Sequence, residues 1–372
     1  MKNPYKILVV GNYPADQQQS MIRFAELLLQ IYRPHAQVRL LCPPVVATRL
    51  PGLPPVARKY LAYIDKLFLF PLWLTLGART YDLIHIADHS NAFYVFCFSP
   101  SRCLVTCHDL LAVRGAMGDS SAACGASALG LWLQRLIMAG LRRSGAVAFD
   151  SQATYDDFQR LGGGPSRQRH AVIPIPLNAP FTADAATFHL SEAEQTLLPT
   201  GPYLLMVGSA LPRKNRTLAL QLLERLGTSS PFRLVLAGEP MAPQEQLFRD
   251  THPLGERLLS ISHPSHALLN WLYCKAHALL FPSLAEGFGW PLLEAQACDC
   301  PVIASTSTSI PEVAGSAAFY ADPYDVATFA EHVQALLDPA ERVRLIQLGH
   351  QNLRRFAPEV VSAAYRRFAF QT

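Results

Sequence analysis

Two glutamates with seven residues between them stand in the stretch 281–297, which reads FPSLAEGFGWPLLEAQA. Glu286 and Glu294 enclose the run Gly-Phe-Gly-Trp-Pro. Two carboxylates near a glycine turn could act as a general acid and base, as acceptors for ligand hydroxyls, or as solvated surface charges. The residues around the pair are needed to choose among these uses.

These surroundings predict a strand, a glycine loop and a helix start. The apolar run 278–281 is typical of a strand, and Pro291 is favoured in the first turn of a helix. The N–H groups and the dipole of a helix N-terminus favour an anion such as phosphate. A phosphate there makes the carboxylates better suited to sugar hydroxyls than to proton transfer. Alternatively, Glu294 only complements the helix dipole and Glu286 is solvated.

A second stretch, 203–215, reads YLLMVGSALPRKN and predicts a strand that leads into a basic loop. Gly208 ends the strand. Arg213 and Lys214 could supply fixed positive charge to a departing diphosphate, where negative charge grows in a transition state. The alternative is a solvated Arg-Lys turn before a helix that Asn215 caps.

Polar residues also follow two predicted strands in the first half of the chain. His108 and Asp109 follow 103–107, and Asp88 and His89 follow 82–86. Ligands bind at the carboxyl ends of parallel strands, which favours a site here, although an isolated histidine is more often structural. His85 lies within its strand and is predicted to be part of the core.

The elements that must position these residues alternate between strand and helix patterns. The predicted strands are 6–10, 37–41, 82–86, 103–107, 146–149, 203–207, 233–237, 278–281 and 302–304. The predicted helices are 20–30, 56–76, 130–142, 153–161, 215–226, 265–276, one starting at 291, 325–337, 340–354 and 358–369. This rhythm predicts two parallel sheets covered by helices, in two Rossmann-like domains. The proline-rich region before residue 203 places the boundaries at 1–178, a linker 179–200, a domain 201–355 and a final helical segment 356–372.

Composition narrows the class of protein. The chain has 372 residues, of which 50% are hydrophobic and 16% charged, so a well-formed core is expected. A net charge of +4 without basic runs argues against nucleic acid as a partner. The eight cysteines are scattered, and the N-terminal residues lack a signal-peptide pattern, so we expect free thiols and a cytoplasmic protein.

The segment 58–76, RKYLAYIDKLFLFPLWLTL, raises the question of a membrane. Its apolar part is about half of the roughly 20 residues that a spanning helix needs. We expect a helix packed on a sheet, with an interfacial membrane helix as the alternative.

From Glu286 to Asp325 the sequence resembles glycosyltransferase family 4. The family's pattern is Glu, seven residues, Glu, an alanine-rich helix, then Pro-Val-Ile-Ala, Pro-Glu, Gly and Asp-Pro. The later parts are present at Pro301–Ala304, Pro311-Glu312, Gly315 and Asp322-Pro323. The resemblance covers the C-terminal half well and the N-terminal half in patches. It implies the GT-B fold, in which two Rossmann-like domains face each other across a cleft, and transfer with retention of configuration.

The resemblance also implies roles for particular residues. The residues expected to bind the donor are Gly208, Arg213, Lys214, Glu286, Gly287, Phe288, Gly289, Trp290, Pro291, Leu292 and Glu294. Within this set Glu294 is expected to accept ribose hydroxyls and Glu286 those of the sugar. Glu286, Arg213, Lys214 and His108 are the predicted catalytic residues, and Gly11, Asp88, His108 and Asp109 are predicted on the acceptor side.

The sequence departs from the family at two places. Ser209 stands where many members have an arginine, a role that Arg213 could take over. Gln17, Gln18 and Gln19 stand where the first loop often has paired glycines, and these side chains could contact an acceptor. The Gly-, Ser- and Ala-rich loop 115–130 is predicted to be either a mobile segment over the acceptor or a plain surface loop.

The predicted protein is therefore a retaining glycosyltransferase. It would move a hexose-type sugar from a GDP- or UDP-sugar to a growing surface polysaccharide or lipid-linked glycan, without a metal or other cofactor and with peripheral contact with the inner membrane surface. The alternative is a non-catalytic nucleotide-sugar-binding protein of the same fold. A dehydrogenase is disfavoured, because GNYPAD after the first strand is not a dinucleotide fingerprint.

Overall fold

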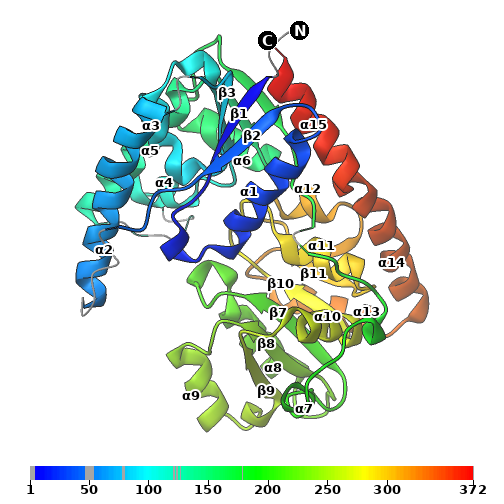
Figure 1. The fold of residues 1–372 in the computed structure, drawn as a ribbon. Coiled ribbons are helices and arrows are strands. Elements are labelled where there is room, and N and C mark those ends of the chain that lie inside the picture. Colours follow the sequence, from blue (N-terminus) through cyan, green and yellow to red (C-terminus); the bar gives the residue numbers. More distant parts are fainter. Residues whose placement is uncertain are drawn as a thin grey trace. The chain divides into compact units, whose positions relative to one another are not determined.

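The computed structural model describes residues 5–46, 54–77, 80–119, 122, 125, 127–177 and 179–371. The chain divides into two compact units. Unit 1 contains the described residues of 5–118, 125–177 and 359–371, and unit 2 contains 119, 122 and 179–358. Each unit is built on a six-stranded parallel sheet with helices packed against it (Figure 1).

The sheet of unit 1 has the strand order β2-β1-β3-β4-β5-β6. Its strands are β1 Lys6–Val10, β2 Gln37–Leu41, β3 Leu83–Ile86, β4 Cys103–Cys107, β5 Ala146–Phe149 and β6 Arg169–Val172. Its helices are α1 Gln19–Tyr32, α2 Pro55–Ile64, α3 Phe70–Gly77, α4 Leu111–Ala116, α5 Ala128–Arg143, α6 Gln152–Arg160 and α15 Pro358–Phe370. The central strands β3, β4 and β5 are buried along their whole length, as parallel strands covered on both faces must be.

The sheet of unit 2 has the order β12-β11-β10-β7-β8-β9. Its strands are β7 Tyr203–Gly208, β8 Arg233–Gly238, β9 Leu258–Ser262, β10 Ala278–Phe281, β11 Val302–Ser305 and β12 Ala318–Ala321. Its helices are α7 Glu192–Gln195, α8 Arg216–Leu226, α9 Pro243–Thr251, α10 His266–Lys275, α11 Trp290–Ala297, α12 Ile310–Ala314, α13 Val326–Ala335 and α14 Pro339–Leu353.

All nine predicted strands are present, with ends that shift by one residue at most. Three further strands, β6, β9 and β12, were not predicted, and neither were the helices α4, α7, α9 and α12. The predicted loop 115–130 instead contains the end of α4 and the start of α5. Residues 120, 121, 123, 124 and 126 of that loop lie outside the described residues.

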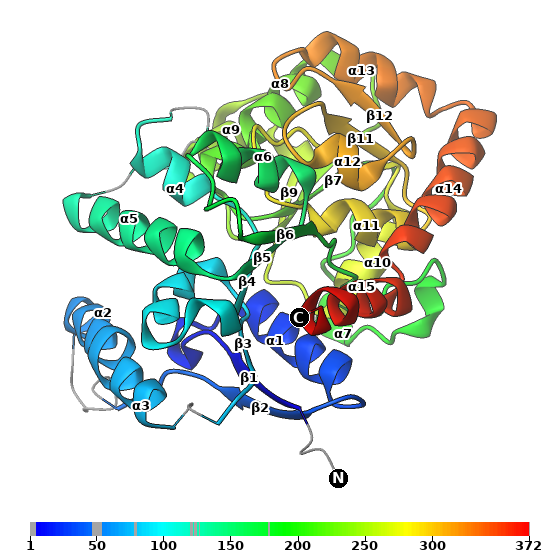
Figure 2. The same cartoon turned by 90° about the horizontal axis from the view of Figure 1, so that it is seen from above.

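Helix α15 belongs to unit 1 although it follows the whole of unit 2 in the sequence. Tyr365 is completely buried, and its ring lies 6.0 Å from that of Phe24 on α1. Arg169 on the edge strand β6 donates a hydrogen bond of 3.0 Å to the carbonyl oxygen of Phe368. Figure 2 shows α15 running beside α1. The helix therefore completes the core of unit 1.

Helices α2 and α3 are joined by one π-helical turn, η3 Asp65–Leu69, and together they confirm the helix predicted at 56–76. One side packs inward, where Phe70 and Leu74 are buried. The other side exposes a stripe of large apolar residues, namely Tyr60, Ile64, Phe68, Leu69, Leu72, Trp73 and Leu76. None of the described helices has the length and apolar content needed to cross a membrane.

Candidate functional site

The two strands that flank the reversal of strand order in unit 2 are β7 and β10. The chain runs outward from β7 through β8 and β9, then returns to the other side of β7 to form β10. The loops after β7 and β10 therefore diverge at their carboxyl ends, which is where open parallel sheets bind ligands. Gly208 ends the first strand, and the predicted residues Arg213, Lys214 and Glu286 lie in these two loops.

Glu286 lies between the two basic side chains. Arg213 donates from a guanidinium nitrogen to Oε2 of Glu286 at 2.6 Å, and Lys214 Nζ donates to Oε1 at 2.6 Å. Only 7% of the glutamate side chain is exposed. Burial alone would raise the pKa of Glu286, but the positive charges of Lys214 and Arg213 outweigh it and lower the pKa. The three side chains form an ionic cluster with one net positive charge.

Hydrogen bonds from the backbone and from neutral side chains fix this cluster. The N–H of Leu284 donates to the carbonyl oxygen of Arg213 at 2.7 Å and ties the two loops together. Asn215 makes no side-chain cap for α8; its side chain donates to the carbonyl oxygens of Pro282 and Pro323. A backbone with positive φ at Asn215 allows this placement.

The loop that carries Glu286 is also held from its other side. The N–H of Glu286 donates to the Thr308 hydroxyl at 2.9 Å. Ser309 donates its hydroxyl to the carbonyl oxygens of Glu286 and Phe288. The loop conformation is thus specified by residues that precede α12, and not by Gly287 and Gly289 alone.

Glu294, the second predicted glutamate, has different partners. It lies on α11 with 5% of its surface exposed, and the hydroxyl of Tyr273 on α10 donates to its Oε2 at 2.8 Å. The solvated alternative is therefore wrong for both glutamates, because each is buried and bonded. Their partner sets are separate, so they can contact different parts of one ligand.

The start of α11 offers fewer free N–H groups than the sequence predicts. Gly289 has a positive φ and is the N-cap, Trp290 and Pro291 begin the helix, and Pro291 has no N–H. The N–H of Leu292 donates to the carbonyl oxygen of Gly289. Phe288 is buried against Phe356. The positive charge of this site therefore comes mainly from Arg213 and Lys214.

The sheet of unit 1 reverses its order between β1 and β3, and side chains also meet there. Asn12, after β1, donates from its amide to Oδ2 of Asp88, after β3, at 2.6 Å. Asn91 in turn donates to the amide oxygen of Asn12 at 3.0 Å. Asp88 also accepts hydrogen bonds from the backbone and hydroxyl of Ser90. The predicted residue Asp88 is thus the centre of a polar network at the reversal.

His108 follows β4 and is paired with a residue that was not predicted. Its Nδ1 lies 2.6 Å from Oδ2 of Asp150, which follows β5, and its Nε2 lies 2.9 Å from the carbonyl oxygen of Ala87. A carbonyl and a carboxylate only accept, so both ring nitrogens carry protons. Burial alone would lower the pKa of His108, but the charges of Asp150 and Asp88 and the two hydrogen bonds raise it to about 9.

This geometry limits what His108 can do for a ligand. Both ring nitrogens are already bonded, so a contact from either one to a sugar would require His108 to leave Asp150 or Ala87. Asp109 accepts the N–H of Leu111 and so holds the start of α4. His85, predicted in the core, is fully buried and bonded to Tyr32 and Thr106.

Gly11 has a packing role in this structure. A Cβ atom at this position would lie 2.8 Å from Sγ of Cys42, so a side chain would collide with the residue after β2. Gly11, which was predicted on the acceptor side, therefore allows the neighbouring loop of unit 1 to approach closely.

A cavity of about 180 Å³ opens beside the Asn12–Asp88 contact. Its lining includes the polar side chains of Asn12, Gln18, Ser90, Asn91 and Gln134, and the rings of Tyr13, Tyr63 and Phe93. Lys66 and Asp16 form an ion pair of 2.6 Å in the same lining. Amides, hydroxyls and aromatic faces are groups that bind sugar hydroxyls and sugar rings.

The sequence pointed to Asp88 and His108 but missed Asn12, Asn91, Gln134 and Asp150. Asn12 and Asp150 carried a usable signal, because both follow a predicted strand within two residues, as Asp88 and His108 do. Gln134 lies on α5, where it lines the cavity, and nothing in the local sequence distinguishes it from other polar residues of the helix. In the part of the chain that the structure describes, no three His, Cys, Asp or Glu side chains are grouped so that they could hold a metal ion.

The family model for glycosyl transferases group 1 matches residues 190–351. This region contains Arg213, Lys214, Glu286 and Glu294. The donor-side residues predicted from the sequence therefore lie inside the matched domain, and the residues of unit 1 before 178 lie outside it.

Known proteins extend this result. The O-antigen chain mannosyltransferase B of Escherichia coli is 36% identical over 149 residues, which are 38% of this chain and 38% of that protein. The match therefore spans less than half the length of either protein.

Two solved structures resemble the whole chain. Sucrose-phosphate synthase from Thermosynechococcus elongatus has a TM-score of 0.72 at 21% identity and covers 98% of both chains. Anabaena Alr3699/HepE in complex with UDP and glucose has a TM-score of 0.68 at 15% identity, covering 99% of this chain and 100% of that one. These likenesses and the two parallel six-stranded sheets confirm the predicted GT-B fold.

Proposed function

We propose that the protein is a retaining glycosyltransferase of family 4 that moves a hexose-type sugar from a GDP- or UDP-sugar to a glycan. The observation that carries this proposal is the Arg213–Glu286–Lys214 cluster at the carboxyl ends of β7 and β10. Its net positive charge suits a diphosphate. The name of the mannosyltransferase relative, and the UDP bound by the Anabaena protein, support a nucleotide sugar as the donor.

In this proposal Arg213 and Lys214 bind the diphosphate and stabilise the charge that grows on it as the sugar leaves. Glu286 holds both cations in place, and its remaining lone pairs can accept sugar hydroxyls. Glu294, oriented by Tyr273, accepts the ribose hydroxyls. The charge and the partners of each side chain support the role proposed for it.

We further propose that the acceptor hydroxyl attacks from the face that the diphosphate leaves, so that configuration is retained. The departing phosphate takes the acceptor's proton, the new glycosidic bond forms, and the bond to the phosphate oxygen breaks. Because two fixed cations already stabilise the charge of the leaving group, this reaction does not call for a metal.

The acceptor is proposed to be a growing surface polysaccharide or a lipid-linked glycan. The cavity beside Asn12 and Asp88 has the polar and aromatic lining that a sugar residue needs. Replacing Gln134 by Ala should raise the acceptor KM about fivefold to tenfold through loss of a hydrogen bond, with little change in kcat. Gln334→Ala, an exposed change on α13, is the control. An unchanged acceptor KM would show that this cavity does not bind the acceptor.

The decisive experiment is a thermal-shift and calorimetry panel with GDP, UDP, ADP and their sugars. Selective stabilisation by GDP or UDP, lost in Lys214→Ala, supports the donor site. If none of the nucleotides binds, the donor-site proposal fails. Binding without sugar transfer to any glycan acceptor would favour the alternative, a non-catalytic nucleotide-sugar-binding protein of the same fold.

We also propose that the apolar stripe on α2 and α3 contacts a lipid bilayer. The stripe contains Tyr60, Phe68 and Trp73, whose rings suit the interface between lipid and water. Within the described residues 54–77 the one carboxylate is Asp65, which is buried, whereas Arg58 is exposed. The exposed charge is therefore positive, which is complementary to anionic lipids.

Vesicle sedimentation tests this contact. The wild-type protein should sediment with vesicles of phosphatidylglycerol, and Phe68→Ser with Leu72→Ser should reduce the bound fraction severalfold. The matched control is Leu247→Ser with Leu337→Ser, two exposed leucines of unit 2. Equal binding by the two double variants would show that the stripe is not the lipid contact.

A further inference from the structure

A cavity of about 850 Å³ lies at the amino-terminal ends of strands in the unit 1 sheet, whereas the polar network lies at the carboxyl ends. Its lining comes from segments that precede β4, β5 and β6, within 96–101, 139–145 and 165–168, and from Arg169, the first residue of β6. Polar residues of the Asn12–Asp88 network and of the His108–Asp150 pair follow the carboxyl ends of their strands. This cavity is therefore separate from the Asn12–Asp88 network and from the His108–Asp150 pair.

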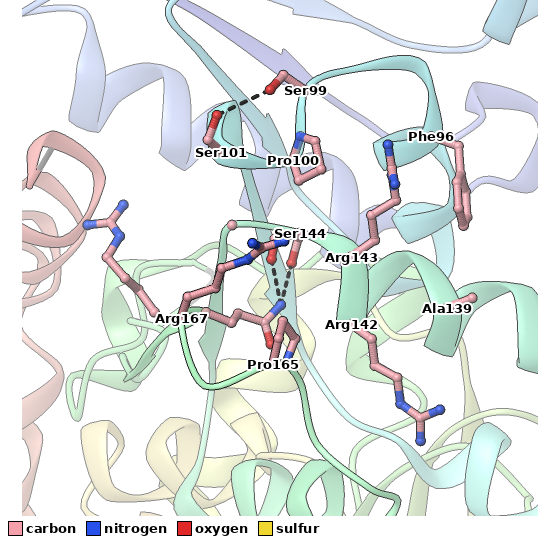
Figure 3. A pocket seen from close by; sticks show the side chains of 13 residues that line it. Phe96, Ser99, Pro100, Ser101, Ala139, Arg142, Arg143, Ser144, Pro165 and Arg167 are labelled. Carbon is pink, nitrogen blue, oxygen red and sulfur yellow. Dashed lines mark hydrogen bonds between the residues drawn. The ribbon is translucent and has the colours of Figure 1, made fainter.

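The charged side chains that line this cavity are all positive. Thirteen described residues line it, among them Arg142, Arg143, Arg167 and Arg169, and none of the thirteen is an aspartate or a glutamate. Figure 3 shows Arg142 and Arg143 leaving the end of α5 in different directions, with Phe96 beside Arg143 and Arg167 on the opposite wall. Four guanidinium groups around one cavity repel one another unless an anion lies between them.

Intramolecular roles account for two of these arginines. Arg142 donates to the carbonyl oxygen of Leu161, and Arg169 donates to the carbonyl oxygen of Phe368 on α15. Arg143 stacks on the ring of Phe96, with 5.5 Å from its guanidinium carbon to the ring centroid. Arg167 is exposed and makes no hydrogen bond or ion pair with any described residue. The guanidinium of Arg167 and that of Arg143 are thus available to a ligand.

Close packing and buried hydrogen bonds fix the walls of this cavity. A Cβ atom at position 145 would lie 2.6 Å from the carbonyl oxygen of Pro100, so Gly145 lets the loop 99–101 pack directly on the start of β5. Gln168 is buried and donates to the carbonyl oxygens of Leu141 and Ser144, which fixes the base of the loop that carries Arg167. The positions from which Arg143 and Arg167 project are therefore fixed.

We infer that this cavity binds a ligand with at least two phosphate groups. Guanidinium groups pair with phosphate oxygens in a bidentate manner, and the hydroxyls of Ser99 and Ser101 add donors to the same wall. The cavity is several times larger than one phosphate, and Phe96, Pro100 and Pro165 give it apolar surface. A diphosphate with an attached apolar or sugar part fits this lining, either as a free molecule or as a lipid headgroup.

Calorimetry with pyrophosphate tests the inference. The variant Arg143→Gln with Arg167→Gln removes two charges without touching the contacts of Arg142 and Arg169. It should weaken one class of pyrophosphate site about tenfold or more, and 0.3 M salt should weaken the same site in the wild type. Arg23→Gln with Arg135→Gln, two exposed arginines outside the cavity, is the charge-matched control.

The proposed donor site also attracts diphosphate, so Lys214→Ala is titrated in parallel. A pyrophosphate site that survives Lys214→Ala and is lost in the Arg143/Arg167 variant supports the inference, whether or not the donor-site proposal holds. The inference is overturned if Lys214→Ala abolishes all pyrophosphate binding, or if the Arg143/Arg167 variant binds pyrophosphate as the wild type does. These outcomes separate failure of this cavity from failure of the donor site.

A second arm identifies the source of the phosphate. The same variants are titrated with two short-chain lipids in place of pyrophosphate. These are dihexanoyl phosphatidic acid and dihexanoyl pyrophosphatidic acid, both used below their micellar concentrations. Tighter binding of the diphosphate lipid than of pyrophosphate, dependent on Arg143 and Arg167, identifies a headgroup. Binding of pyrophosphate alone identifies a soluble ligand. If no compound binds in an Arg143/Arg167-dependent manner, the cavity is not a phosphate site.

Discussion

Both sheets reverse their strand order beside their first strand, but the ionic side chains at the two reversals are paired differently. In unit 2 one carboxylate, Glu286, lies between Arg213 and Lys214, which leaves a net positive charge. In unit 1 Asp88 binds Asn12 and its Oδ1 lies 3.1 Å from Nδ1 of His89, while Asp150 is paired with His108. The same scaffold thus leaves an excess of positive charge at the reversal in unit 2 and pairs carboxylates with histidines at the reversal in unit 1.

The largest expected effect comes from removing a cation of unit 2. Lys214→Ala should lower sugar transfer about 100-fold to 1,000-fold, because a fixed charge on the leaving diphosphate is lost. Steady-state kinetics and calorimetry with the nucleoside diphosphate measure this effect. Lys275→Ala, an exposed lysine of the same unit, is the control. A loss below about threefold would remove Lys214 from the reaction.

The corresponding change in unit 1 should affect stability. The pKa of His108 is raised to about 9 from an ordinary value of 6.5, so its stabilising effect is complete below pH 6.5 and is lost as pH rises through 9. A shift of this size corresponds to about 3 kcal/mol, from which the cost of burying the Asp150 carboxylate, whose own pKa burial raises, is subtracted. Asp150→Asn should remove most of that free energy at pH 6 and flatten the decline between pH 6.5 and 9.

Hydrogen exchange in β4 and β5, corrected for intrinsic rates and measured across this pH range, checks the prediction. Asp156→Asn, an exposed acid on α6, should leave both the stability and its pH dependence unchanged. Wild-type protection that stays constant from pH 6 to 9.5 would show that His108 is not held as a cation.

Glu286→Gln sharpens the contrast, because it should separate binding from catalysis. Without the carboxylate the two cations gain net charge, so the nucleoside diphosphate should bind equally well or a few times more tightly. Transfer should still fall about tenfold to 100-fold, because Arg213 and Lys214 lose the group that positions them. Parallel losses in binding and in rate would argue that Glu286 binds the donor and does not organise the cations.

The smallest expected effect is that of metal removal. If Arg213 and Lys214 neutralise the diphosphate, dialysis against EDTA should change the transfer rate less than about twofold. The rate is measured before and after addition of Mg²⁺ or Mn²⁺ to the dialysed protein. A loss that either ion restores would contradict the proposed role of the two cations.

The strands that the sequence failed to predict share one property, since β6, β9 and β12 are all edge strands. An edge strand is covered less completely, so its sequence is less apolar. RHAV in β6 has no buried residue, whereas LIHI in β3 is buried throughout. The interior strands could be predicted because burial on both faces imposes an apolar run.

For the site, the sequence identified the loops but not the pairings. Arg213 and Glu286 are 73 positions apart, and nothing local predicts that their side chains meet. The same holds for His108 and Asp150, which are 42 positions apart. Strand order decides such contacts, and it follows from the packing of the whole sheet. A resemblance can therefore assign a role to one residue without predicting which side chains will be paired with it.

The place of α15 in unit 1 has a consequence for synthesis on the ribosome. When residue 178 has been made, the sheet of unit 1 is complete, but Tyr365, which packs against α1, has not yet been translated. Unit 2 can fold first, although its sequence begins later. Ribosome-bound chains stalled at residue 340 should thus be cut by protease faster in α1 than chains released after residue 372.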